Sequence, residues 1–303
     1  MTLAENIENL NQSLTGSISP AVATPINRET GELQIDVIPQ LVDFLIARGV
    51  GGLFVGGTTG EGVFLDSDQR RKLHEISVSV AGGRVPVMVH AGALQTETAV
   101  ELARHAASIG ADAIAAITPI FYGIHDNALV AYYQAIAEAA PELPLFAYEM
   151  PHMAVNGISP ELARRMFMEI PSLAGLKSSN RDAQVIRGLL DVIPDGRILL
   201  AGNESIALGS LALGANGMIS GLATAVPEPL VAMINAFIAG DLVEARRQQQ
   251  LINHLLEAIP AGARIGSLKA ILEARGIPIG PPVLPLPEAS SDIWTDMVEI
   301  LES

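Results

Sequence analysis

Lys177 is the residue whose type and setting most clearly suggest chemistry. It is one of only three lysines among 303 residues, and it lies in the apolar, strand-like run 173–178. Burial disfavours the ammonium form, so part of such an amine would be neutral near pH 7. A neutral amine can attack a ketone carbonyl, which is the first step of Schiff-base catalysis. Under the structural alternative, the stem packs and the head reaches solvent or pairs with a carboxylate.

The other two lysines have ordinary surroundings in the sequence. Lys72 lies on a polar helical face near Glu75, and Lys269 precedes Glu273 and Arg275 in a C-terminal helix. Charged neighbours at helical spacing are typical of solvent-exposed faces. We therefore expect neither of these lysines to act as a nucleophile.

Two other segments carry groups that could bind or transfer a proton. The turn at 56–62 is glycine-rich and contains Thr58 and Thr59. Its free N–H groups and hydroxyls could hold a carboxylate or phosphate, although such turns also occur only to reverse the chain. Tyr148 ends an apolar run three residues before Pro151. Its phenol could transfer protons, or it could be a core tyrosine with a satisfied hydroxyl.

Composition excludes several classes of partner. The chain is 49% hydrophobic and 17% charged, which indicates extensive burial in a large fold or in subunit interfaces. Its net charge of -15 argues against nucleic acid or an anionic membrane as partner. It has no cysteine, hence no disulfide or thiolate site. The N-terminal segment has no basic region, and no apolar run approaches the ~18 residues of a membrane span, so we expect a cytoplasmic protein.

Short apolar runs alternate with amphipathic segments of helical period, which is typical of a parallel sheet with crossover helices. The pattern predicts strands at 18–25, 52–56, 86–91, 113–118, 144–150, 173–178, 197–201 and 217–220. It predicts helices at 36–47, 67–80, 96–109, 126–139, 159–170, 181–193, 205–213 and 228–239. Eight such units predict an α/β fold, a (β/α)8 TIM barrel over residues 1–240. Residues 241–303 are predicted to form a C-terminal helical extension, interrupted by a proline-rich segment at 278–287.

In such a barrel the active site lies at the C-terminal ends of the strands, where the three segments above fall. The Gly-Thr-Thr-Gly-Glu loop at 57–61, the Tyr-x-x-Pro segment at 148–151 and Gly-Leu-Lys at 175–177 together resemble one family. It is the pyruvate-dependent class I aldolase family typified by dihydrodipicolinate synthase and N-acetylneuraminate lyase. Supporting matches are Ala-Thr-Pro at 23–25, Gly-Ala-Asp at 110–112, Thr-Pro at 118–119 and Gly-Asn-Glu at 202–204.

The resemblance implies a homotetrameric lyase that needs no metal and no cofactor. Lys177 would form an imine with pyruvate, and Tyr148 would act as general acid and base. The carboxylate of pyruvate would bind to Thr58 and Thr59. Other residues implied in substrate binding, through backbone carbonyls that line the pocket, are Gly202 and Ile219. Within the loop, Glu61 is expected to brace the backbone rather than to react.

Departures from the family pattern bear on the second substrate. The synthases carry an arginine after the Tyr-x-x-Pro segment, where this chain has Met153, and a second tyrosine after Thr-Pro, where it has Phe121 followed by Tyr122. A thioether cannot bind a carboxylate as an arginine does. We therefore expect a 2-keto-3-deoxy sugar acid or sialic-acid-like substrate, with Glu149 and the Asn203-Glu204 pair near its polyol end. The alternative is dihydrodipicolinate synthase (4-hydroxy-tetrahydrodipicolinate synthase) activity, which condenses pyruvate with the aldehyde aspartate semialdehyde.

Two further alternatives belong to other classes. A metal-dependent class II aldolase would need converging ligands, and His90 and His152 do lie near predicted strand ends. No short-range histidine pair supports that interpretation, and His90 is expected either to pack or to support residues that contact the substrate. A barrel that binds a keto acid without turning it over is the other possibility, and it would form no imine with pyruvate.

Overall fold

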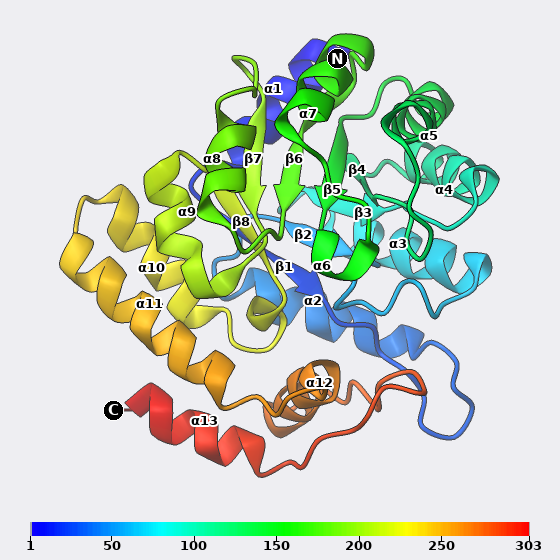
Figure 1. The fold of residues 1–303 in the computed structure, drawn as a ribbon. Helices are drawn as coiled ribbons and strands as arrows, with labels where there is room; N and C mark the ends of the chain where they lie inside the picture. Colours follow the sequence, from blue (N-terminus) through cyan, green and yellow to red (C-terminus); the bar gives the residue numbers. More distant parts are fainter. Residues whose placement is uncertain (1, 303) are drawn as a thin grey trace.

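The computed structural model describes residues 2–302, which form a closed barrel of eight parallel strands (Figure 1). Each strand pairs with the next in the sequence, and the first pairs with the last. The predicted (β/α)8 barrel is therefore confirmed. The strands are β1 (Ile18–Val22), β2 (Leu53–Val55), β3 (Val87–His90), β4 (Ala113–Ile117), β5 (Leu145–Glu149), β6 (Leu173–Ser178), β7 (Ile198–Ala201) and β8 (Gly217–Ser220).

Helices follow the strands and cover the outside of the barrel, as the helical spacing predicts (Figure 1). They are α2 (Ile38–Ile46), α3 (Ser67–Ala81), α4 (Thr96–Ser108), α5 (Asp126–Ala139), α6 (Pro151–Ala154), α7 (Pro160–Glu169), α8 (Ala183–Leu190), α9 (Ala207–Leu213) and α10 (Glu228–Ile238). Single 3-10 turns are η1 (Ile35–Val37), η2 (Glu204–Ile206) and η3 (Leu222–Thr224). No helix within residues 2–302 is long and apolar enough to cross a membrane.

An additional helix that the strand and helix pattern did not predict, α1 (Leu3–Leu14), precedes the barrel. Thr2 and Glu5 form a capping box at its start, a signal that is readable in the sequence. Its buried side chains Ile7 and Leu10 pack with those of the barrel interior. The Asn11 amide donates to the backbone carbonyl of Ala174 at 3.2 Å. Helix α1 therefore packs against the N-terminal ends of the strands.

The register between strands β5 and β6 places the candidate catalytic side chains next to each other. Tyr148 pairs directly with Lys177, and both strands are buried throughout. Two residues earlier on β6, a Cβ at Gly175 would lie 2.3 Å from the Ile198 carbonyl oxygen and 2.7 Å from the Phe146 ring. Glycine is therefore needed there so that the phenylalanine ring can fill the barrel below the reactive layer.

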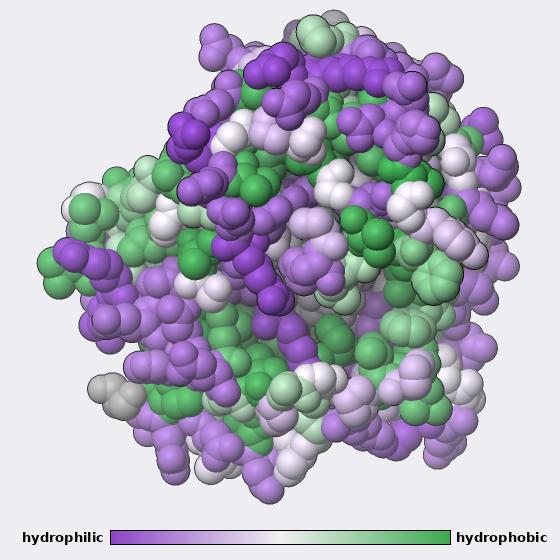
Figure 2. Space-filling view, viewed as in Figure 1, coloured by the Kyte–Doolittle hydropathy of each residue, from purple (hydrophilic) through white to green (hydrophobic). Residues whose placement is uncertain are grey.

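The C-terminal extension consists of α11 (Leu242–Glu257), α12 (Arg264–Ala274) and α13 (Ile293–Glu302). In Figure 1 these orange and red helices lie below the barrel, on the side to which the strand arrows point. In the same view, hydrophilic side chains dominate the upper margin of the molecule and apolar ones are interspersed lower down (Figure 2). The position of the three helices in Figure 1 thus places the C-terminal extension beside the end of the barrel where the chemistry is expected.

Candidate active site

A cavity of about 860 Å³ opens at the C-terminal ends of the strands. It contains all six residues that the sequence assigns to catalysis or substrate binding, namely Lys177, Tyr148, Thr58, Thr59, Gly202 and Ile219. Residues of the C-terminal extension complete its wall, including Leu256, Arg264, Ile265, Leu286 and Pro287. Folding therefore brings the predicted residues together, and the extension helps to enclose them.

Lys177 is buried, with 3% of its surface exposed, and its Nζ borders an aromatic layer. The Nζ atom lies 3.8 Å from the centroid of the Tyr148 ring and 4.1 Å from that of Phe54. Burial lowers the pKa of Lys177 below the ordinary value of 10.5, while Tyr148 and Glu204 act in the opposite direction. No carboxylate in residues 2–302 forms an ion pair with it. The amine therefore neither reaches bulk solvent nor pairs with an acid, unlike in the structural alternative.

The hydroxyl of Tyr148 points toward the glycine-rich turn. It lies 3.5 Å from Thr58 Oγ1 and 3.2 Å from Met150 Sδ. Its ring meets Phe54 edge to face, with centroids 6.0 Å apart. A phenol fixed in this way beside an amine can move protons between that amine and a bound substrate.

The turn after β2 has the geometry of an anion-binding loop. A Cβ at Gly62 would lie 1.9 Å from the Gly56 carbonyl oxygen, so the turn closes only with glycine there. Thr24 donates its hydroxyl to the Gly60 carbonyl at 2.6 Å, which fixes the turn against the segment that follows β1. The N–H groups of Thr58 and Thr59 donate to no acceptor among the described residues. They are free to bind a carboxylate near Lys177.

Glu61 braces this turn, as the sequence predicts. It is buried at a φ of 57°, and its carboxylate accepts from the Val283 N–H at 2.5 Å. It also forms an ion pair with Lys269, whose Nζ lies 2.5 Å from Glu61 Oε1. The expectation that Lys269 has ordinary surroundings is wrong, because its side chain is only 2% exposed. The cause is tertiary, since the helix that carries Lys269 packs against the turn.

Glu204 is a second buried carboxylate, and it lines the cavity. Burial raises its pKa, but Arg264 and hydrogen bonds hold that pKa below its usual range. Its Oε1 atom accepts from Arg264 at 2.7 Å and from the N–H groups of Gly221 and Leu222. Its Oε2 atom has no partner within residues 2–302. An ionised acceptor is therefore available to a donor group of a ligand.

Arg181 and Arg264 also line the cavity, and sequence analysis missed both. Arg181 follows β6 by three residues, so its place at a strand end was a signal that could have found it. Met153 lines the cavity as predicted, whereas Phe121 and Tyr122 do not line it. Both of these aromatic residues are more than 70% exposed.

The histidines do not form a metal site. His90 Nε2 accepts from the Ile117 N–H at 3.1 Å, and the Arg70 guanidinium donates to the His90 carbonyl at 2.6 Å. Burial, followed by the charge of Arg70, lowers the pKa of His90 well below its usual value. Among the described residues, His152 is the only histidine in the lining of the cavity. No group of three acidic or histidine side chains in the described part of the chain is placed to hold a metal ion. His90 therefore has a packing role.

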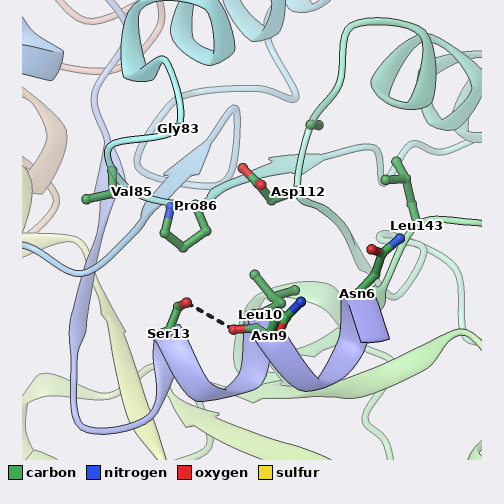
Figure 3. A pocket seen from close by; sticks show the side chains of 10 residues that line it. Asn6, Asn9, Leu10, Ser13, Gly83, Val85, Pro86, Asp112 and Leu143 are labelled. Atoms are coloured by element: carbon green, nitrogen blue, oxygen red, sulfur yellow. Dashed lines mark hydrogen bonds between the residues drawn. The ribbon is translucent and has the colours of Figure 1, made fainter. Parts of the chain in front are cut away.

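A smaller cavity of about 380 Å³ lies at the opposite end of the barrel, between α1 and the strands (Figure 3). Asn6, Asn9 and Leu10 of α1 face Pro86 and Asp112 across it in this view. The Asp112 carboxylate accepts from the Val87 N–H at 2.8 Å. Its lining contains no lysine, so it offers no amine for a keto acid.

Comparison with known proteins agrees with this geometry. A model of the dihydrodipicolinate synthetase family matches residues 14–303. The chain belongs to the dihydrodipicolinate synthetase family. Members of this family are lyases that form a lysine Schiff base with pyruvate, so the chain is an enzyme of this class.

Relatives in the family carry different names. The 4-hydroxy-tetrahydrodipicolinate synthase of Exiguobacterium sibiricum is 34% identical over 283 residues, covering 93% of this chain and 96% of the relative. The N-acetylneuraminate lyase of Rattus norvegicus is 36% identical over 293 residues, covering 93% of this chain and 90% of the relative. The wild-type sialic acid aldolase of Ruminococcus gnavus superposes with a TM-score of 0.91 at 28% identity, covering 95% of this chain and 97% of that chain. These similarities support the family without selecting a substrate.

The first prediction concerns the imine. Incubation with pyruvate and borohydride should add one reduced pyruvate to Lys177, because it alone of the three lysines is both buried without an acid partner and open to the cavity. Lys177→Arg should abolish the adduct, because a guanidinium stays protonated. Intact-mass and peptide mass spectrometry measure both results. Lys72→Met serves as the control and should leave labelling unchanged, whereas a label on Lys72 or Lys269 would refute the assignment.

The second prediction concerns Tyr148. Tyr148→Phe removes the hydroxyl near Thr58 and keeps the ring beside Lys177, so turnover should fall by ~10²-fold or more with little change in the melting temperature. Steady-state kinetics and thermal unfolding measure the two quantities. A variant with unchanged turnover would show that Tyr148 is only a core residue.

Proposed function

We propose that this chain is a pyruvate-dependent class I aldolase or lyase acting on a 2-keto-3-deoxy sugar acid or a sialic-acid-like substrate. The observation that carries the proposal is the placement of Lys177. Its amine is buried against the Tyr148 and Phe54 rings without an acid partner, inside an open cavity. Burial lowers the pKa of this amine, which increases the neutral fraction that can attack a carbonyl.

The proposed reaction begins with attack of the Lys177 amine on the keto carbon of the substrate. The resulting carbinolamine loses water and leaves an iminium ion, with Tyr148 supplying and removing the protons. Tyr148 then takes the proton of the C4 hydroxyl and the C3–C4 bond breaks, so an aldehyde departs and the electron pair forms an enamine. Protonation at C3 and hydrolysis release pyruvate and restore the amine. Thr58 and Thr59 hold the carboxylate, which orients the keto carbon toward Lys177.

The cavity supports a polyhydroxylated substrate. The free Oε2 of Glu204 is an ionised acceptor for a hydroxyl group. Other polar groups that line the same cavity are Ser179, Asn203 and Ser205. A cavity of about 860 Å³ is within the usual range for small-molecule sites, and it leaves room beyond a three-carbon keto acid. The similarity to N-acetylneuraminate lyases and to a sialic acid aldolase points the same way.

Dihydrodipicolinate synthase activity is the second candidate, and one observation favours it. Arg181 lines the cavity and forms no hydrogen bond or ion pair with any described residue. Its guanidinium could bind the carboxylate of aspartate semialdehyde in place of the arginine that Met153 replaces. Relatives named 4-hydroxy-tetrahydrodipicolinate synthase also support this candidate.

Three expectations stay predictions: the homotetrameric state, the cytoplasmic location, and the boundary at residue 240 between the barrel and the C-terminal extension. Exposed apolar side chains on the loops after β3, β4 and β5 support association of subunits, among them Leu94, Phe121, Tyr122 and Val155. Figure 2 shows apolar side chains interspersed with polar ones over the middle and lower parts of this face. Patches of this kind are typical of interaction surfaces.

The third prediction separates the two candidates. A panel of 2-keto-3-deoxy acids, including N-acetylneuraminate, should contain at least one compound from which the enzyme releases pyruvate. Condensation of pyruvate with aspartate semialdehyde should be poor, because Met153 supplies no charge-assisted hydrogen bond, and losing that contact costs ~1.5–3 kcal/mol, or about one to two decades in efficiency. Coupled assays of pyruvate release and uptake measure both rates.

Two matched variants identify the contacts behind that difference. Glu204→Gln should weaken cleavage of the sugar acid, because the ionised acceptor is lost, and Arg181→Gln should leave that cleavage nearly unchanged. Efficient condensation that depends on Arg181, with no cleavage of any sugar acid, would establish the synthase instead.

A further inference from the structure

The ion pair between Lys269 and Glu61 joins the C-terminal extension to the turn that carries Thr58 and Thr59. Both side chains are almost completely enclosed, with 2% and 0% exposed, and the charged atoms lie 2.5 Å apart. Lys269 is on α12, whereas Glu61 lies in the turn after β2, six residues beyond the end of that strand. Two charges taken out of water this completely need close partners, because an unpaired buried charge is strongly unfavourable.

Backbone groups of the extension complete the contact. Lys269 Nζ donates to the Pro281 carbonyl at 2.8 Å, and the Val283 N–H donates to Glu61 Oε2. Burial lowers the pKa of Lys269, and Glu61 acts against that shift. Glu61 is thus held by a side chain of α12 and by the backbone of the segment that follows α12.

The backbone at Glu61 has a conformation that this contact stabilises. Its φ of 57° is in the left-handed region, which residues other than glycine rarely adopt. The Glu61 N–H donates to the Thr58 carbonyl at 3.1 Å, so the position of Glu61 is linked directly to that of the threonine. Displacement of the Glu61 side chain would therefore alter the direction of the free N–H groups at Thr58 and Thr59.

We propose that Lys269 is a positioning residue for keto-acid binding and that the C-terminal extension is part of the pyruvate site. Through Glu61, Lys269 fixes the turn in the form that binds the substrate carboxylate. The inference rests on the carboxylate-binding role proposed for Thr58 and Thr59.

The same helix makes a second contact of this kind. Arg264, five residues before Lys269 on α12, pairs with Glu204 after β7 at 2.7 Å. One helix of the extension thus contacts the loops on two sides of the cavity, one that holds the keto acid and one that faces its distal end. An extension that only covered the barrel surface would not need charged side chains reaching both loops.

The experiment uses the full chain with Lys269→Met and with the double substitution Glu61→Gln and Lys269→Met. The double variant removes both charges, so it leaves no buried charge without a partner and remains testable where the single variant fails to fold. We measure the pyruvate concentration that gives half-maximal borohydride trapping, together with the extent of trapping at saturation and the melting temperature. Both variants should need at least tenfold more pyruvate, while saturating pyruvate still labels Lys177.

Two controls separate positioning from stability. Lys72→Met changes an exposed lysine, and Ile252→Val weakens the core at α11, which is remote from the turn in sequence. Each should leave half-maximal trapping unchanged even where the melting temperature falls. A folded double variant with wild-type pyruvate dependence would overturn the inference. Absence of any adduct in the wild-type enzyme would instead refute the proposed function.

Discussion

The chemistry depends on keeping one amine out of water without giving it an acid partner. Lys177 lies against two aromatic rings, which are apolar but tolerate a nearby cation. An ion pair there would favour the ammonium form and suppress nucleophilic attack. Two buried carboxylates near the site avoid this because each pairs with another cation, Lys269 for Glu61 and Arg264 for Glu204. The carboxylates of Glu61 and Glu204 are therefore paired with cations other than Lys177.

The C-terminal extension has a larger part in the site than its position in the chain suggests. Its residues close the cavity, and α12 contacts both the turn after β2 and the loop after β7. The barrel supplies the amine, the phenol and the free N–H groups, while the extension sets the loops that surround them. In the lining of the cavity, Arg181 has no partner among the described residues and Glu204 has a free Oε2 atom, so the two offer opposite charges to a substrate.

Much of the barrel was predictable because its signals are local. Alternating apolar runs and helical periods predict all eight strands, and the side chains at their C-terminal ends include Lys177 and Tyr148. The environment of Lys269 was not predictable, because its partner Glu61 is distant in the sequence and the adjacent charges Glu273 and Arg275 suggest an exposed face. Helix α1 was not predicted although Thr2 and Glu5 form a capping box, because it precedes the first strand and lies outside the repeating strand–helix pattern.

The central claim is that burial makes the Lys177 amine available as a nucleophile, and its ionisation tests this most directly. The rate of borohydride trapping at subsaturating pyruvate can be measured as a function of pH, with Tyr148→Phe as a check that the phenol is not the group observed. Because burial lowers the pKa of Lys177 from its ordinary value of 10.5, the rate should rise with pH and reach its midpoint below 10.5. A midpoint at or above 10.5 would contradict the account.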